Sequence, residues 1–202
     1  MPTASMPQNN AKEERLKTCW SGFCDGNIDA FDEMVQRMYK MLHNYGTKFT
    51  EDEEMIKDCL QDLFLDLWDR RAKLHAIEVP RLYLLQAFRN NLIHRMRNNG
   101  RFTSLDDEVK VLDIAEESGI LKRETDEYNS DRLRIMMDML PKRQREALYL
   151  RYYENLSYQE IADLMGLRRQ AVANYLQLGV QKMKQYWCQV VFTGIILLSR
   201  FL

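Results

Sequence analysis

Apolar residues recur at helical spacing through the first half of the chain. The clearest stripe lies between positions 52 and 71, at i, i+3, i+4, i+7 and i+8: Leu60, Leu63, Phe64, Leu67 and Trp68. This spacing puts all five on one side of an amphipathic helix. Shorter stripes predict helices from about Glu13 to Phe23, around Phe31 to Leu42, and from Pro80 to about Asn98.

The helical period fades between 99 and 129 and returns near Ser130. The fading stretch is acidic and has Gly119 in its middle, so it predicts a linker with at most one short helix. We therefore predict an all-α protein with two small helical domains joined by a flexible acidic linker. The predicted divisions are 13–98 for the first domain, 99–129 for the linker, 130–187 for the second domain and 188–202 for an apolar C-terminal tail.

The second domain contains the spacing of a helix-turn-helix in the sequence YQEIADLMGLRRQAVANYL. Just before and inside it, Ser157 and Glu160 form the S-x-x-E pattern of a capping box, which starts a helix. Ala162 lets two helices approach closely, and Gly166 permits a sharp turn four residues later. The ordered set predicts two short helices packed across a turn.

The second helix of this pair presents amide and basic side chains to solvent, because Val172 and Leu176 face the core. Its outward positions and its first residues contain no carboxylate: Arg168, Arg169, Gln170, Asn174, Gln177 and Gln181. Glutamine and asparagine both donate and accept hydrogen bonds at base edges, as a helix in the major groove requires. The alternative is a helix pair that only packs against its neighbours.

Aspartates gather on the side of the predicted 52–71 helix that lies opposite its apolar stripe. At 100° per residue this side holds Asp58, Asp62, Asp66 and Asp69, with Leu65 and Gln61 beside them. The leucine and the amide give this otherwise charged surface an apolar and hydrogen-bonding spot. The alternative is a plain solvated face.

The predicted helix from Pro80 to Asn98 has a polar side without acids. Its exposed positions are Tyr83, Gln86, Asn90, His94 and Arg97, while Arg89 and Arg95 flank the boundary with the buried side. Aromatic, amide and guanidinium groups together suit a phosphate backbone with unstacked bases. An ordinary polar helix surface is the alternative, although such a surface usually mixes both signs of charge.

The net charge is −1, which argues against a free-standing DNA-binding protein. Charge is nevertheless segregated along the chain. The stretch from Arg81 to Arg101 has five arginines and no carboxylate, whereas acids gather in 51–69 and 106–131. Basic faces and acidic segments on one chain could hold nucleic acid and a protein partner together.

The cysteines and histidines predict neither a catalytic nor a metal site. Cys19, Cys24, Cys59 and Cys188 form no CxxC pair, which favours buried thiols in a reducing compartment. The three histidines form no constellation with a nucleophile or metal ligands. The first ten residues lack the apolar core of a signal peptide, so we expect a cytoplasmic protein that acts by binding, without a cofactor and not as an enzyme.

Three stretches, in their order and spacing, resemble the extracytoplasmic-function group of bacterial RNA polymerase sigma factors. They read DCLQDLFLDLW at 58–68, PRLYLLQAFRNNLIHRMR at 80–97 and LPKRQREALYLRYYENLSYQEIADLMGL at 140–167. The resemblance covers roughly residues 26–186 and implies a factor that binds core polymerase and directs promoter-specific initiation. The sequence departs from the family at Arg168 and Ala171, where Ser and Thr are common, and at His94, where Asp is common.

The resemblance gives each stretch a role. The first implies docking on the coiled-coil clamp of the largest polymerase subunit, through Asp58, Gln61, Asp62, Leu65 and Asp66. The second implies contact with the minus-ten promoter element, through Arg81, Tyr83, Arg89, Asn90, Arg95 and Arg97. The third implies a recognition helix in the major groove of the minus-thirty-five element, with Ser157, Arg168, Arg169, Gln170, Asn174, Gln177 and Gln181 as candidate DNA contacts.

The apolar stretch from Val190 to Leu198 is short for a membrane span, which takes about 20 residues. A final helix packed on the second domain, or a surface for an inhibitory anti-sigma protein, fits better. Two other functions remain open, namely a helix-turn-helix regulator of the response-regulator type and a helical adaptor that binds only protein. A pulldown with core polymerase and run-off transcription separate both from a sigma factor.

Overall fold

The computed structural model describes residues 7–98 and 136–199, with side chains described for 11–98 and 136–186. Within these ranges the regular elements are helices, with no strand. The chain divides into two compact units, Met1–Thr103 and Ser104–Leu202. The predicted all-α, two-domain class is confirmed, while the predicted linker at 99–129 lies outside the described residues.

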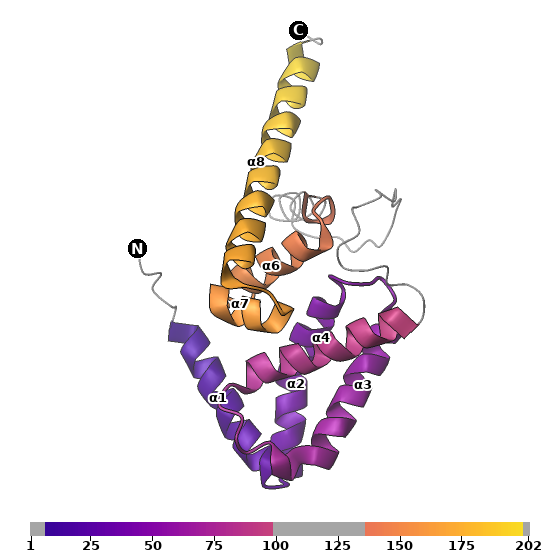
Figure 1. Ribbon diagram of the computed structural model, residues 1–202, viewed down its shortest axis with the longest axis vertical. Coiled ribbons are helices and arrows are strands. Elements are labelled where there is room, and N and C mark those ends of the chain that lie inside the picture. The colour runs from indigo at the N-terminus through magenta and orange to yellow at the C-terminus, as the bar shows by residue number, and fades with distance from the viewer. Residues whose placement is uncertain (1–6, 99–135, 200–202) are drawn as a thin grey trace. The chain divides into compact units, whose positions relative to one another are not determined.

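The described part of the first unit is a bundle of four α-helices with one short 3-10 helix. These elements are α1 (Pro7–Cys24), α2 (Ile28–Gly46), α3 (Glu53–Arg70), η1 (Arg71–Lys73) and α4 (Pro80–Asn98). α4 crosses the other three α-helices and packs against each of them (Figure 1). The core consists of side chains without exposed surface, among them Phe23, Met34, Leu42, Ile56, Leu60, Leu84, Phe88 and Leu92.

Polar side chains fix where α2 and α3 begin. Asn27 Oδ1 accepts a hydrogen bond from the Ala30 amide at 3.1 Å, and Asp52 Oδ1 accepts one from the Met55 amide at 3.0 Å. Each bond satisfies a backbone donor that has no partner inside its own helix. Gly26 lies just before α2 with φ of +87°, a left-handed conformation that glycine adopts without strain.

An aromatic side chain on α1 holds the loop that precedes α4. Trp20 Nε1 donates a hydrogen bond to the carbonyl oxygen of Leu74 at 3.3 Å. The same indole packs edge-on against the ring of Tyr83 in the first turn of α4, with centroids 5.8 Å apart. α1 therefore positions both the loop and the start of α4, where the sequence predicts DNA contacts.

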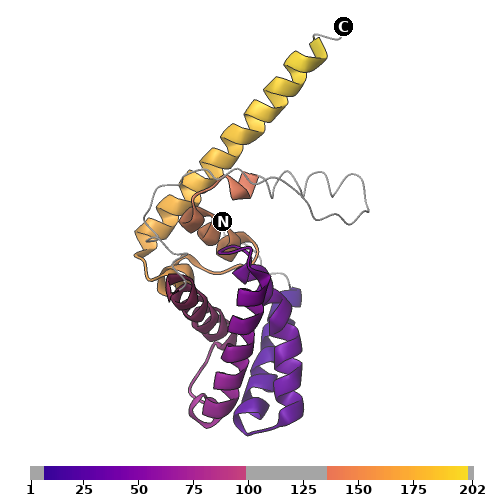
Figure 2. The ribbon, with the colours of Figure 1, turned by 90° about the vertical axis from the view of Figure 1, so that its right-hand side faces the viewer.

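The described part of the second unit contains α6 (Lys142–Tyr152), α7 (Tyr158–Met165) and α8 (Arg169–Ser199), preceded by helical residues 136–138. α6 and α7 both pack against the first half of α8 (Figure 2). Their shared core includes Leu140, Leu148, Leu150, Ile161, Val172 and Leu176. The apolar side chains of the second unit therefore form one core between α8 and the two shorter helices.

The predicted capping box occurs at the start of α7, and the predicted sharp turn occurs at its end. Ser157 Oγ accepts a hydrogen bond from the Glu160 amide at 3.2 Å, and Glu160 Oε2 accepts one from the Ser157 amide at 2.7 Å. The capping box is therefore confirmed. Gly166 ends α7 with φ of +66°, and the Leu167 amide donates to the carbonyl oxygen of Ala162 at 2.8 Å. The left-handed Gly166 and the Leu167 bond turn the chain into α8.

α8 extends past residue 187, where the predicted second domain ends. It runs unbroken from Arg169 to Ser199 and so includes most of the stretch 188–202 that the sequence predicts as an apolar tail. The helix continues because this stretch contains no proline to interrupt its backbone hydrogen bonds. No helix in the described part of the chain is both long enough and apolar enough to cross a membrane.

α8 approaches α6 closely at Gly179, a residue that the sequence analysis did not single out. A Cβ atom at Gly179 would lie 2.7 Å from Leu148 Cδ1 and 3.2 Å from Leu148 Cγ. Leu148 is itself buried, so its side chain has little room to move away. The close approach of the two helices therefore depends on the missing side chain.

We expect Gly179→Ala to destabilise the second unit by roughly 1–2 kcal/mol, because overpacking a core outweighs the gain in helix propensity. On an open helix surface the same change would stabilise by about 1 kcal/mol, so the sign of the effect is informative. Urea unfolding followed by circular dichroism measures it. In a Leu148→Ala background, Gly179→Ala should no longer lower the free energy of unfolding. An equal decrease in both backgrounds would show that Leu148 is not the cause.

Candidate functional site

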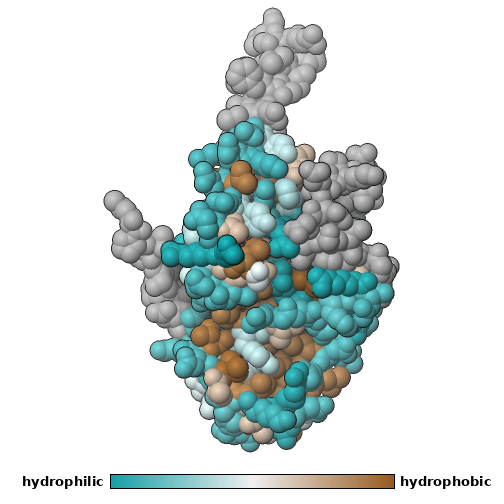
Figure 3. Space-filling view, in the orientation of Figure 1, coloured by the Kyte–Doolittle hydropathy of each residue, from teal (hydrophilic) through white to brown (hydrophobic). Residues whose placement is uncertain are grey.

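Five candidate residues share the exposed side of α3, and we call them the α3 face: Asp58, Gln61, Asp62, Leu65 and Asp66. Leu65 has 58% of its surface exposed, although it lies in the middle of a helix. Figure 3 shows apolar side chains bordered by hydrophilic ones on the face of the first unit turned to the viewer. Asp66 forms an ion pair with Arg70 one turn later. The α3 face therefore combines a solvated leucine with carboxylates on either side of it.

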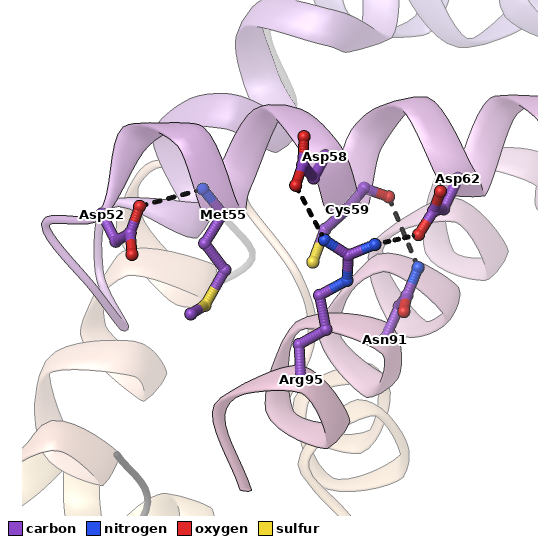
Figure 4. A network of polar contacts seen from close by, with 7 residues as sticks. All are labelled: Asp52, Met55, Asp58, Cys59, Asp62, Asn91 and Arg95. Atoms are coloured by element: carbon purple, nitrogen blue, oxygen red, sulfur yellow. Dashed lines mark hydrogen bonds and ion pairs between the residues drawn. The ribbon is translucent and has the colours of Figure 1, made fainter. Parts of the chain in front are cut away.

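One arginine of α4 bridges two of these carboxylates. Arg95 Nη1 donates to Asp58 Oδ2 at 3.1 Å, and Arg95 Nη2 donates to Asp62 Oδ2. Figure 4 shows the guanidinium reaching from α4 across to both aspartates on α3. The family resemblance implies a DNA contact for Arg95 and a protein partner for the two aspartates. The structure brings the three side chains together in one network.

A buried thiol lies under this bridge. Cys59 is fully buried, and the Asn91 side chain on α4 donates to its carbonyl oxygen at 3.4 Å. Burial raises the pKa of the Cys59 thiol to about 11, and the nearby Asp62 and Asp58 add to the rise while Arg95 opposes it. The thiol is therefore neutral at physiological pH, and it packs in the α3–α4 interface as an apolar group.

Stability should fall at high pH because of Cys59. The pKa of Cys59 in the folded chain, about 11, lies above its ordinary value of 9.0. The neutral thiol therefore contributes its full share to the free energy of unfolding below pH 9, and this share is lost as the pH rises towards 11. The loss should reach about 2 kcal/mol. The free energy of unfolding of wild type minus that of Cys59→Ala should shrink between pH 9 and pH 11. A constant difference across that interval would contradict the assignment.

The exposed side of α4 carries part of the predicted DNA-binding set. Asn90 and Arg97 are exposed, as are Gln86 and His94 on the same side of the helix. We call these four residues the α4 face. It contains amides, an imidazole and a guanidinium but no carboxylate, as the sequence pattern predicts. Groups of this kind can bind phosphates and unpaired bases.

The other α4 candidates have less access to solvent. Arg89 keeps only 6% of its surface exposed and lies at the edge of the apolar stripe of α4, between Leu85 and Leu92. Arg81 Nη1 lies 3.4 Å from Glu13 Oε1 on α1, and 17% of the Arg81 side chain is exposed. Tyr83 is half-buried against Trp20. In this conformation the surface offered by α4 is therefore narrower than the sequence pattern indicates.

The N-terminal part of α8 presents the whole predicted recognition set to solvent. We call the exposed residues the α8 face: Arg168, Arg169, Gln170, Asn174, Gln177 and Gln181. Gln170 Nε2 donates to Asn174 Oδ1 at 3.2 Å, which orients both amides and does not use the two amide hydrogens of Asn174. Ser157 is exposed at the start of α7, where its hydroxyl caps the helix.

Polar side chains brace α6, the helix that supports α8, and the sequence pattern did not predict their bonds. Tyr149 Oη donates to Glu154 Oε1 at 2.9 Å, and both residues are buried. Arg145 Nη2 donates to the Asp138 carbonyl oxygen at 2.5 Å, while Arg145 Nη1 lies 3.3 Å from Asp138 Oδ1. Burial lowers the pKa of Arg145, and Asp138 partly offsets this. The Arg145 bonds attach the segment before α6 to that helix, and the Tyr149 bond attaches the turn after it.

Comparisons with protein families match each unit separately. Residues 34–102 match the Sigma-70 region 2 family, and residues 130–183 match the family Sigma-70, region 4. The two matches together cover more than half of the chain. The α3 and α4 faces lie in the region 2 match, and the α8 face lies in the region 4 match. A region 2 followed by a region 4 defines a sigma factor, the subunit that gives RNA polymerase its promoter recognition.

Curated relatives narrow the class. SigZ, an RNA polymerase sigma factor of Bacillus subtilis (strain 168), is 24% identical over 154 residues, covering 76% of this chain and 85% of SigZ. The ECF RNA polymerase sigma factor SigM of the same organism is 24% identical over 157 residues, covering 76% and 92%. The chain belongs to the extracytoplasmic-function (ECF) group of RNA polymerase sigma factors.

Two solved structures share the fold. One is CnrH in complex with the cytosolic domain of CnrY, with a TM-score of 0.60 at 19% identity over 87% of this chain and 98% of the matched chain. The other is the sigma factor RpoE in complex with the anti-sigma factor NepR from Bartonella quintana, with a TM-score of 0.59 at 18% identity over 78% and 96%.

Proposed function

We propose that this sigma factor uses its three exposed faces for three different contacts. The α3 face docks on the clamp of the largest polymerase subunit, the α4 face binds the minus-ten element, and the α8 face reads the minus-thirty-five element. One observation carries this proposal. The α8 face is exposed, acid-free and rich in amides, and it lies at the start of the second helix of a helix-turn-helix whose first helix has a capping box. Such a surface can read base edges in a major groove.

The proposed mechanism consists of binding steps, with no covalent step by the chain itself. A net charge of −1 gives the free chain little general attraction to DNA, so polymerase docking must supply much of the affinity. Once docked, the α4 face captures unpaired bases of the minus-ten element. The free energy of that capture offsets part of the cost of opening the duplex. We place this activity in the cytoplasm.

Transcription from a promoter library with purified core polymerase tests the function. The expected result is run-off product from a subset of promoters only when the chain is present, with a shared pair of elements among those promoters. A response-regulator-like protein would bind duplex DNA without polymerase and would not replace a sigma factor in this assay. Lack of any chain-dependent start site would contradict the proposal.

We also propose that an anti-sigma protein controls the chain, because the solved structure of RpoE was determined with the anti-sigma factor NepR. The exposed Leu65 and the acids beside it form a surface that polymerase and an inhibitor would compete for. The test is a competition experiment with an isolated partner. The partner should reduce both run-off transcription and the amount of chain bound to core polymerase, and an inhibitor that leaves polymerase binding unchanged would contradict competition at the α3 face.

A further inference from the structure

An ion-pair bridge of three charged side chains links the α3 face to the edge of the α4 face. Arg95 lies on α4 beside the α4 face, while its two bonding partners, Asp58 and Asp62, belong to the α3 face. The bridge lies at the surface, with 33% of the Arg95 side chain, 61% of the Asp58 side chain and 50% of the Asp62 side chain exposed. A polymerase surface and a DNA strand can therefore both reach it.

The bridge hides the positive charge of Arg95 from DNA. Two carboxylates face one guanidinium, so the cluster as a whole is negative and repels a phosphate. The N–H groups of Arg95 that point to α3 are also already used as donors. Arg95 consequently adds little to phosphate binding while the bridge is intact, even though it lies beside the acid-free α4 face.

The bridge is also weak enough to be displaced. Ion pairs with exposed partners contribute little net stability, because water solvates the separated charges well and the long side chain regains freedom. A protein partner that presents its own cations to Asp58 and Asp62, in an interface that excludes water, can replace Arg95 there. The released guanidinium is then within reach of a strand that lies along α4.

We propose that Arg95 couples polymerase docking to DNA capture: cations of the docked polymerase take over Asp58 and Asp62, and the released Arg95 binds a DNA phosphate. This inference rests on the proposed function of the α3 face. The free chain would bind single-stranded DNA weakly, and docking would strengthen that binding. By thermodynamic linkage, a bound strand would strengthen docking by the same factor.

The test uses the full-length chain without polymerase and a short fluorescein-labelled single-stranded deoxyoligonucleotide. Asp58→Asn/Asp62→Asn imitates release, because it removes the charges that hold Arg95 and changes little in shape. We expect it to bind the oligonucleotide about five- to tenfold more tightly than wild type at low salt. One additional phosphate contact should also steepen the slope of log K against log salt by about 0.7.

A charge-matched double variant separates release of Arg95 from a general change in charge. Glu53→Gln/Asp69→Asn removes two exposed acids of the same helix that do not bond Arg95. Its gain in oligonucleotide affinity should therefore be smaller, and its salt slope should equal that of wild type. Adding Arg95→Gln to Asp58→Asn/Asp62→Asn should cancel the gain and the steeper slope. Near-ultraviolet circular dichroism checks that each variant keeps its packing.

Two outcomes would overturn the coupling: equal gains in the two double variants, or a gain that survives Arg95→Gln. Both measurements are made on the free chain, so they are independent of the function assay. If wild type directs promoter-specific transcription but the gain does not depend on Arg95, the coupling is wrong and the sigma activity stands. If wild type directs no transcription, the proposed function fails whatever the oligonucleotide binding shows.

Discussion

Leu65→Arg is expected to abolish recovery of the chain with core RNA polymerase. Leu65 is 58% exposed between the acids of the α3 face, so its side chain is available to enter an apolar pocket of a partner. Loss of such an anchor commonly costs 2 kcal/mol or more, which corresponds to about 30-fold in affinity. The arginine adds a buried charge to that loss. Affinity pulldown with purified core polymerase and run-off transcription should both fail together.

The matched control is Ile28→Arg, which places the same residue at another exposed apolar position of the first unit. Ile28 is 68% exposed at the start of α2, outside all three proposed faces. The Ile28→Arg variant should be recovered with core polymerase in nearly the same amount as wild type. If Leu65→Arg folds normally, as circular dichroism would show, and is still recovered in full, the α3 face is not the docking surface.

The sequence predicted those features that depend on one helix at a time. The apolar stripe of α3, the capping box at Ser157 and the sharp turn at Gly166 all follow from local spacing, and all three occur in the structure. The exposure of Leu65 follows in the same way, because at 100° per residue it falls on the side of α3 away from the apolar stripe.

Features that depend on a neighbouring helix were not predicted. Arg89 and Arg95 both lie at the edge of the apolar stripe of α4, where the helical period alone does not decide the direction of a long side chain. Arg89 turns inwards and is buried, whereas Arg95 reaches the aspartates of α3. A search for opposite charges on consecutive helices would have paired Arg95 with Asp58 or Asp62, but only the packing of α4 on α3 selects those partners.

Gly179 shows the same limit in the second unit. Glycine inside a helix lowers helix propensity, and the sequence alone does not explain why a glycine stands at this position. The reason lies on α6, where Leu148 fills the space that a side chain at 179 would need. The close contact fixes α8 against the rest of the second unit, so it also fixes the direction in which the α8 face points.

Asn174→Ala should reduce promoter-specific transcription about tenfold or more, because an amide that contacts a base edge contributes roughly 1–3 kcal/mol of discrimination. In the structure Asn174 is exposed, and the hydrogen bond that its Oδ1 accepts from Gln170 orients the side-chain amide without using its hydrogens. Run-off transcription from the cognate promoter and from promoters with single substitutions in the minus-thirty-five element measures the effect. The variant should lose its preference at one or two positions of that element.

Two further substitutions on α8 separate base reading from other effects. Gln185→Ala alters an exposed amide of the same helix outside the α8 face, and it should leave activity and preference unchanged. Arg169→Ala should lower activity on every promoter by a similar factor and flatten the salt dependence, because a phosphate contact carries no sequence information. If Asn174→Ala behaves like Arg169→Ala, with a uniform loss and an unchanged order of preferred promoters, then Asn174 contacts the backbone and base reading must be assigned to other residues of the α8 face.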